Sequence, residues 1–195
     1  MTDQTQPYVG EVIESSTMEF IAESRVLHSA PPFGTYVRID SFPTIYAITF
    51  NVCTQSIEPN RRPTAYGKTE EELYLEQPQI FELLRTEFHS LIIGYRDDTG
   101  IWQCLPPHPP RIHSFVHFCS AEEIAQFTDN SHFLRPLFTL AKVPSDELAI
   151  AAVRNAYLAR RENGQYLVRA GKELARLLKD DYDRLSSIIK RIQQN

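Results

Sequence analysis

The chain has 195 residues, of which 42% are hydrophobic and 23% are charged, and its formal net charge is −5 at pH 7. This composition is near the average for folded proteins and excludes a chain that stays disordered because it is too polar and too highly charged. No apolar run approaches the roughly 18 to 20 residues that cross a bilayer, and the polar N-terminus lacks the features of a signal peptide. We therefore expect a cytoplasmic protein with no membrane insertion.

The first half of the chain shows the alternation of apolar and polar residues that is typical of half-buried strands. The alternation is clearest in Thr17–Glu23 and in Tyr46–Val52. Five further segments also fit short strands, namely residues 8–14, 35–40, 88–96, 101–105 and 113–119. The polar run Asp97-Asp98-Thr99-Gly100 predicts a turn. Seven short strands at this spacing favour a β-barrel or a β-sandwich.

A helical insert is expected near residues 69–85, between two of these strands. Thr69 and Glu72 have the spacing of a capping box, in which each side chain bonds the backbone N–H of the other residue. Pro78 is suited to open a second short helix, because its fixed backbone angle matches the first helical position. The insert therefore makes a long crossover within the strand region.

The sequence contains no complete catalytic motif of a familiar class. Gly67-Lys68-Thr69 resembles the end of a phosphate-binding P-loop, but Arg62 stands where that loop needs its first glycine. A helix N-terminus beside Lys68 can still hold an anion. Neither a G-x-S-x-G elbow nor an H-E-x-x-H helix occurs, so we expect no enzymatic activity. An enzyme with an unfamiliar site is a rival hypothesis, and it requires a deep pocket with convergent polar groups.

The cysteines Cys53, Cys104 and Cys119 are too few and too scattered for a disulfide framework, and we expect them to be small buried residues. His113 and His117 lie close to two of them in sequence. As residues of one strand, these histidines are about 13 Å apart, which is too far for both to bind one zinc ion. Only a bend or bulge would bring them together, so no metal or other cofactor is expected.

Four prolines in five positions predict a rigid, extended polyproline segment between two strands. The residues concerned are Pro106, Pro107, Pro109 and Pro110, followed by Arg111. Such a segment either docks into an aromatic groove of a partner or braces the path between the strands. We favour bracing, and we keep these five residues as candidates for partner binding.

From residue 120 onwards the pattern becomes helical. Ser120 and Glu123 form a second capping box, Ser145 is placed to cap a longer helix, and Gly164 is placed to end it. A last helix is expected from Gln165 to Gln193. Its seam, at three-four spacing, holds Leu167, Gly171, Leu174, Leu178, Asp181, Leu185, Ile188 and Ile192. We expect this seam to be buried mainly against the chain's own helices, and a partner helix is the alternative.

The C-terminal part is basic although the chain as a whole is acidic. Residues 151–195 carry 10 Lys and Arg against 5 Asp and Glu, whereas residues 1–150 carry 10 against 20. Five of the basic residues lie close together in the sequence, namely Arg160, Arg161, Arg169, Lys172 and Arg176. The simplest interpretation is a solvated helix face, and the alternative is a surface for an acidic protein or a phosphate backbone. Arg169, Lys172 and Arg176 are therefore candidate partner-binding residues.

Several stretches of the chain resemble a known family. Gly10–Ser16 with Phe20, and Pro32–Val37, resemble the HAS barrel, a small β-barrel shared by the HerA bipolar DNA helicase and rotary ATP synthase subunits. Nearly the whole chain is similar to short HAS-barrel proteins of cyanobacteria, with the closest similarity in Gln77–Phe81, the proline segment and Leu178–Leu185. The resemblance implies a barrel that joins subunits and offers a docking surface, while catalysis belongs to a separate ATPase domain. No motif of such a domain is present in this chain.

We therefore expect an α+β fold with a small antiparallel barrel resembling the HAS barrel at residues 7–119, including the helical insert, and a helical region at residues 120–195. The expected function is that of a non-catalytic assembly or adaptor module, which binds a protein complex through the barrel surface or the C-terminal helices. The alternative is a nucleic-acid-associated accessory protein linked to DNA processing. The helicase similarity favours this alternative, and the overall acidity opposes it.

Overall fold

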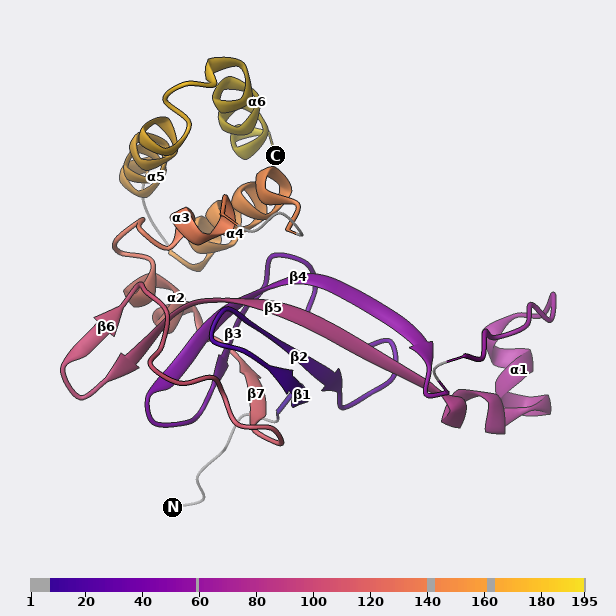
Figure 1. Ribbon diagram of the computed structural model, residues 1–195. Helices are drawn as coiled ribbons and strands as arrows, with labels where there is room; N and C mark the ends of the chain where they lie inside the picture. Colours follow the sequence, from indigo (N-terminus) through magenta and orange to yellow (C-terminus); the bar gives the residue numbers. More distant parts are fainter. Residues whose placement is uncertain (1–7, 59, 140–142, 161–163, 195) are drawn as a thin grey trace.

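The strands form a closed six-stranded antiparallel β-barrel in the computed structural model, which describes residues 8–58, 60–139, 143–160 and 164–194 (Figure 1). The seven strands of the sheet are β1 (Gly10–Ser15), β2 (Glu19–Ser24), β3 (Tyr36–Ile39), β4 (Thr44–Ser56), β5 (Leu84–Asp97), β6 (Gly100–Trp102) and β7 (Phe115–Phe118). Their order is β2-β1-β7-β3-β4-β5-β6, and a pairing between β2 and β5 closes the ring. Strand β6 pairs only with β5 and lies outside the closed ring.

Each of the seven segments predicted to be strands overlaps an observed strand. The predicted turn is also confirmed, because Asp97 pairs with Gly100 and its carboxylate accepts hydrogen bonds from the backbone N–H groups of Thr99 and Gly100. Strands β4 and β5 are longer than predicted, since they continue together to the pair Ser56 and Leu84. The alternation rule missed these ends because the end of β4 is exposed or only partly buried on both faces, and the buried residues before Phe88 in β5, Thr86 and Glu87, are polar.

The barrel wall is buried on both faces where the helices cover it. Alternate residues of β4 illustrate this, because Ile45 and Ala47 belong to the core inside the barrel. Tyr46 and Ile48 point the other way and belong to a second core, which the barrel shares with the helices. The barrel and the helical region are thus joined by one continuous apolar interface.

Five helices follow the barrel and lie together on one side of it (Figure 1). They are α2 (Ala121–Phe127), α3 (Leu134–Leu137), α4 (Ser145–Ala159), α5 (Gly164–Leu177) and α6 (Tyr182–Gln193). Helix α4 contacts all four of the others. None of the helices in the described part of the chain is long and apolar enough to span a membrane.

Helix α4 approaches the barrel closely at Gly34. A Cβ atom at this glycine would lie 2.4 Å from the Cβ of Ala151, and its φ of +80° also favours glycine. Asn155 donates a 2.8 Å hydrogen bond to the carbonyl of Gly34, and the hydroxyl of Tyr36 donates to the carbonyl of Ala152 at 3.0 Å. These contacts fix α4 against the barrel.

Two predicted helix ends are wrong. Pro144, not Ser145, occupies the cap position of α4, where the backbone enters the helix without a side-chain hydrogen bond. The helix ends at Ala159, and Gly164 is the first residue of α5 instead of the terminator of α4. Arg161 lies outside the described residues.

The predicted last helix is two helices. Helix α5 ends at Leu177, and α6 begins at Tyr182 after a reversal of the chain. Asp181, which was assigned to the apolar seam, instead caps α6 by accepting a hydrogen bond from the backbone N–H of Arg184 at 3.1 Å. The break has a physical reason, because a capping aspartate and the hairpin that it starts let both helices pack on α4.

The prediction that the seam is buried internally is confirmed. Leu174, Leu178 and Ile188 are buried in the core shared by the helices and the barrel. Leu167, Leu185 and Ile192 are partly buried and pack against the same core. The seam therefore holds the helical region together.

Candidate functional site

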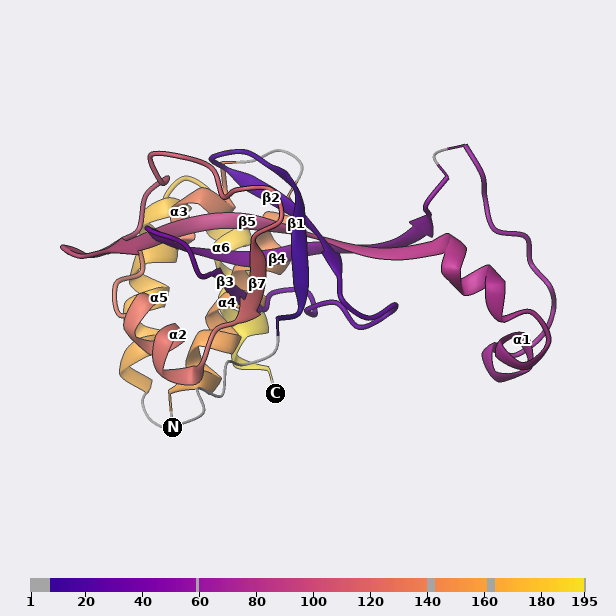
Figure 2. The same cartoon turned by 90° about the horizontal axis from the view of Figure 1, so that it is seen from below.

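A two-stranded arm projects from the barrel and carries a small helical unit at its far end (Figures 1 and 2). Strand β5 pairs with β2 only from Glu87 to Leu91, so beyond Glu87 the strands β4 and β5 have only each other as neighbours. We call residues 54–86 the arm. It contains α1 (Glu70–Glu76) and the 3-10 helix η1 (Pro78–Leu83). None of the described residues from Gln55 to Arg85 is buried.

The far end of the arm is ordered by local contacts. The predicted capping box is confirmed, because Thr69 and Glu72 exchange backbone-to-side-chain hydrogen bonds of 2.8 and 3.3 Å. Tyr74 stacks on Phe81 with 3.7 Å between the ring centres, which joins α1 to η1. The ammonium group of Lys68 forms an ion pair with Glu76, so this P-loop-like lysine has a partner within the arm.

Apolar side chains and acidic charge share the surface of the arm. Leu75 is 86% exposed, and Tyr66 and Tyr74 are each nearly half exposed. A groove of about 210 Å³ lies beside Tyr66. Its apolar lining includes Leu73, Ile80, Phe81 and Leu83, and Arg61 and Arg62 also line it. Residues 57–83 contain six glutamates against three Lys and Arg. The arm therefore combines an acidic surface with an apolar groove.

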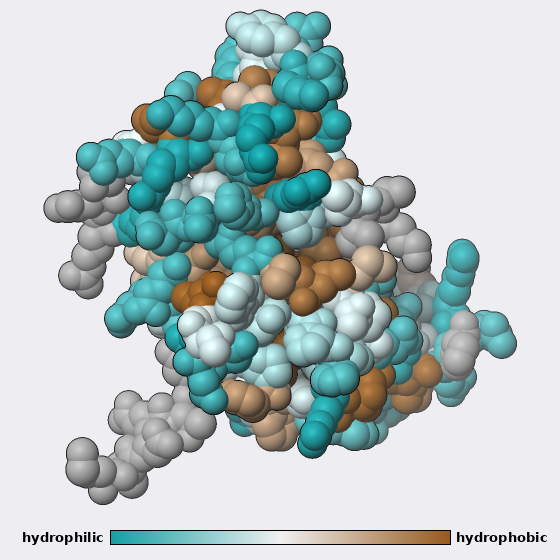
Figure 3. Space-filling model, turned by 60° about the vertical axis from the view of Figure 1, so that its left-hand side comes forward, coloured by the Kyte–Doolittle hydropathy of each residue, from teal (hydrophilic) through white to brown (hydrophobic). Residues whose placement is uncertain are grey.

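The basic candidates on α5 are exposed, but two of the three have acidic partners in the same chain. Arg169 bonds Asp129 at 3.1 Å, and Arg176 makes two hydrogen bonds to Glu173, at 2.6 and 3.0 Å. Lys172 is exposed. Figure 3 shows that the surface over the helical upper part of the molecule is mostly hydrophilic, with small apolar patches. Much of the positive charge predicted for this face is therefore balanced locally.

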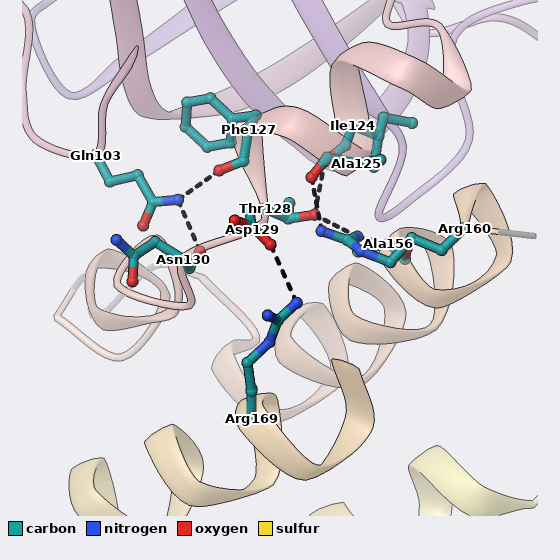
Figure 4. Close-up of polar contacts among 10 residues, drawn as sticks. All are labelled: Gln103, Ile124, Ala125, Phe127, Thr128, Asp129, Asn130, Ala156, Arg160 and Arg169. Carbon is teal, nitrogen blue, oxygen red and sulfur yellow. Dashed lines mark hydrogen bonds and ion pairs between the residues drawn. The ribbon is translucent and has the colours of Figure 1, made fainter. Parts of the chain in front are cut away.

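Arg160 does not belong to that face, which corrects the grouping made from sequence. Its guanidinium donates to the carbonyls of Ala125 and Ala156, at 2.7 and 2.9 Å, and to the hydroxyl of Thr128 at 2.7 Å (Figure 4). The group also lies 4.2 Å above the ring of Tyr166. Burial lowers the pKa of Arg160, and burial raises the pKa of Tyr166. Arg160 therefore ties α4 to α2.

The proline segment is half buried against the barrel. Pro106 and Pro110 are buried, and the hydroxyl of Ser15 donates a 2.7 Å hydrogen bond to the carbonyl of Pro110. Pro107, Pro109 and Arg111 are exposed. The buried prolines and the bond from β1 support bracing, while the outer edge of the segment is open to solvent.

Two histidines of this region have different acidic partners. His113 precedes β7 with a left-handed φ of 69°, and its Nδ1 lies 2.6 Å from a carboxylate oxygen of Glu11. His117 lies within β7, with its Nε2 3.6 Å from a carboxylate oxygen of Asp40. Cys104 is exposed and Cys53 and Cys119 are only partly buried, so the expectation of buried cysteines is wrong.

A cleft of about 610 Å³ lies between β5 and the helices. Leu91 and Ile93 are among its apolar lining residues, and Arg176 lines it from α5. Gln103 holds the barrel to the helices here, because its amide donates to the carbonyls of Phe127 and Asn130 at 2.5 and 2.7 Å (Figure 4). Its amide oxygen accepts from the backbone of the helical region as well. At this cleft, the polar groups of Gln103 and Arg176 are thus bonded to other residues of the same chain.

Sequence reasoning missed one cluster of possible metal ligands. Cys53, Glu87 and His89 come together where the arm leaves the barrel, and their ligand atoms all lie within 4.8 Å of one another. Cys53 and His89 are 36 positions apart in the chain, so no short sequence motif predicts the cluster. Only the pairing of β4 with β5 brings them to one place.

No protein-family model matches this chain, and no curated protein is found to be related to it. The functional conclusion is therefore drawn from the geometry of these surfaces.

Proposed function

We propose that this protein is a non-catalytic assembly or adaptor module whose arm docks on a protein partner. The observation that supports the proposal most strongly is that the arm is folded, yet none of its described residues between Gln55 and Arg85 is buried in either core. Ordering a backbone costs about 1–2 kcal/mol per residue in conformational entropy, and most protein segments offset this cost by burial in a core. An arm that lacks this burial is suited to bury its apolar side chains against a partner in a complex.

The partner surface that fits the arm is basic around an apolar projection. The six glutamates of residues 57–83 favour a positively charged rim, because complementary charge speeds association and fixes orientation. The groove beside Tyr66 accepts an apolar side chain, and full burial of Leu75 contributes about 1.5–3 kcal/mol. Large side chains buried at the centre of an interface supply most of its binding energy.

The resemblance to the HAS barrel supports the same conclusion, since the barrels of that family join subunits and offer docking surfaces. In this proposal the HAS-like barrel is the rigid base from which the arm extends. The exposed edge of the proline segment and the basic residues Arg169, Lys172 and Arg176 are secondary candidates for contact with the complex.

The alternative of a nucleic-acid-associated protein is favoured by the helicase similarity and by the excess of basic residues after position 150. The structure pairs Arg169, Arg176, Arg184 and Arg191 with acidic side chains, and the partly buried Arg160 bonds groups within the chain. Fluorescence anisotropy with labelled DNA at low and moderate salt separates the two functions. We expect weak binding with a shallow salt dependence, and tight binding that falls steeply with salt would favour the alternative.

The proposal is tested by substitutions at the exposed end of the arm. Affinity capture from the native cell first identifies the partner, which is then purified and titrated directly by calorimetry. We expect Tyr66→Ser with Leu75→Ser to weaken this binding by about tenfold or more, which is 1.4 kcal/mol. The matched control is Leu158→Ser with Val168→Ser, since these residues are 73% and 57% exposed on the helices. Equal binding by the arm variant and the wild type would refute the proposal, and sedimentation of the protein alone shows whether the partner is a second copy.

A further inference from the structure

The root of the arm brings three different metal-ligating side chains to one face of the sheet. Cys53 on β4 pairs directly with Glu87 on β5, and His89 follows Glu87 by two positions. Paired residues share a face, and so do residues two apart on a strand. The side chains therefore converge, with Sγ of Cys53 4.0 Å from Nε2 of His89.

We propose that Cys53, Glu87 and His89 form a binding site for a divalent cation of the zinc type. Thiolate, imidazole and carboxylate are the ligands of tetrahedral zinc sites, and the ligand bonds are about 2.0–2.3 Å long. Two ligand atoms of such a tetrahedron are about 3.3–3.7 Å apart. The ligand atoms lie within 4.8 Å of one another, so they must move together by about 1 Å to bind one cation, and side-chain rotation supplies this movement.

The surroundings of the cluster hold the ligands in place before a cation arrives. One carboxylate oxygen of Glu87 is 2.8 Å from Nε of Arg85, and the other accepts a 2.7 Å hydrogen bond from Gln55. The ring of Phe50 packs edge-on against His89, with 6.0 Å between the ring centres. When a cation binds, one oxygen of Glu87 exchanges its contact with Arg85 or Gln55 for the cation, and the other oxygen keeps its hydrogen-bonding partner.

Binding also requires a proton to leave. Burial raises the pKa of the Cys53 thiol, and the negative charge of Glu87 raises it further. Formation of the metal–sulfur bond breaks the S–H bond and releases one proton to solvent, with no change of oxidation state. Cys53 and His89 are half-buried, so the fourth coordination position is left to water.

The position of the site gives it a structural consequence. Glu87 is the first residue of β5 that pairs with β2, so the cluster lies where the arm meets the closed barrel. A cation bound to both β4 and β5 would fix the direction in which the arm projects. The site stands on its own geometry and does not rest on the proposed docking function.

The test is a titration of the reduced, metal-free full chain with cobalt(II), which gives visible bands when tetrahedral and a near-ultraviolet band when bound to thiolate. We expect one equivalent to bind and zinc to displace it. Cys53→Ser should remove the thiolate band, and His89→Gln or Glu87→Gln should weaken binding by about tenfold or more. The matched controls, Cys104→Ser and His108→Gln, change exposed residues of the same types and should leave the titration unchanged.

Two results would overturn the site. One is the absence of any cobalt spectrum at saturating metal, and the other is a thiolate band that survives Cys53→Ser but disappears in Cys104→Ser. Melting curves of each variant show that it is folded. Glu87→Gln keeps the shape of the side chain, which allows a loss of metal binding to be distinguished from a loss of structure.

Discussion

The strands β4 and β5 pass through two regions of the molecule that differ sharply in burial. Within the barrel, Ala47 faces the inner core and Ile48 the outer core, so the strand is covered on both sides. Beyond Glu87 the same two strands form the arm, where Leu75 is 86% exposed. The same hairpin therefore stabilises the barrel at its base and exposes its side chains to solvent at its far end. Changes in the two regions should therefore have separable effects.

The largest difference is expected for apolar side chains. Phe133→Ala removes a side chain that is completely buried between the barrel and the helices, and it should lower the free energy of unfolding by about 3–5 kcal/mol. Leu75→Ala in the arm should change that free energy by less than about 0.5 kcal/mol. Urea denaturation followed by circular dichroism measures both variants, and similar losses would mean that the arm belongs to the cooperative core.

A second contrast concerns two arginines of the body, by which we mean the barrel and the helices without the arm. Arg160→Met removes a guanidinium that bonds two backbone carbonyls and Thr128, and it should cost about 1–3 kcal/mol because these acceptors lose their partner. Arg154→Met on the same helix changes an exposed residue and should be nearly neutral. Thermal melts of the pair give the answer, and equal melting temperatures would show that Arg160 is not structural.

A smaller effect is expected from the two capping boxes, which have the same chemistry in different regions. Ser120→Ala removes the cap of α2, which packs on the shared core, and should cost about 1 kcal/mol of global stability. Thr69→Ala removes the cap of α1 and should leave the melting temperature unchanged. Hydrogen exchange should instead become faster in α1 alone. An equal fall in melting temperature for both variants would contradict the separation of arm and body.

Local chemistry made the strands, the capping boxes and the buried seam predictable from sequence. The alternation around Phe50 and the spacing of Ser120 and Glu123 are signals carried by neighbouring residues. The outer ends of β4 and β5 carry no such signal, since strands without a core need no alternation. The ends of the helices depend on capping contacts, which the spacing of apolar residues does not reveal. Asp181, for example, caps α6 instead of joining the apolar seam.

The candidate sites were less predictable because they depend on contacts between distant residues. The basic face could be read from composition, but its pairing with residues such as Asp129 requires the fold. The arm was expected only as a helical insert, and its projection follows from the lack of strand neighbours beyond Glu87. The cluster of Cys53 and His89 depends on the register between two strands, which the sequence does not specify.

The most direct test of the account replaces residues 57–83 by Asn-Gly, which joins Ser56 to Leu84 through a two-residue hairpin turn. These two residues are already paired in the sheet, and Asn-Gly favours the turn that matches the twist of such strands. Calorimetry measures the melting temperature of this variant and its binding to the purified partner. We expect a melting temperature within about 2 °C of the wild type, because the arm contributes little to the free energy of unfolding, together with loss of binding. A large fall in melting temperature, or binding that persists at full strength, would contradict it.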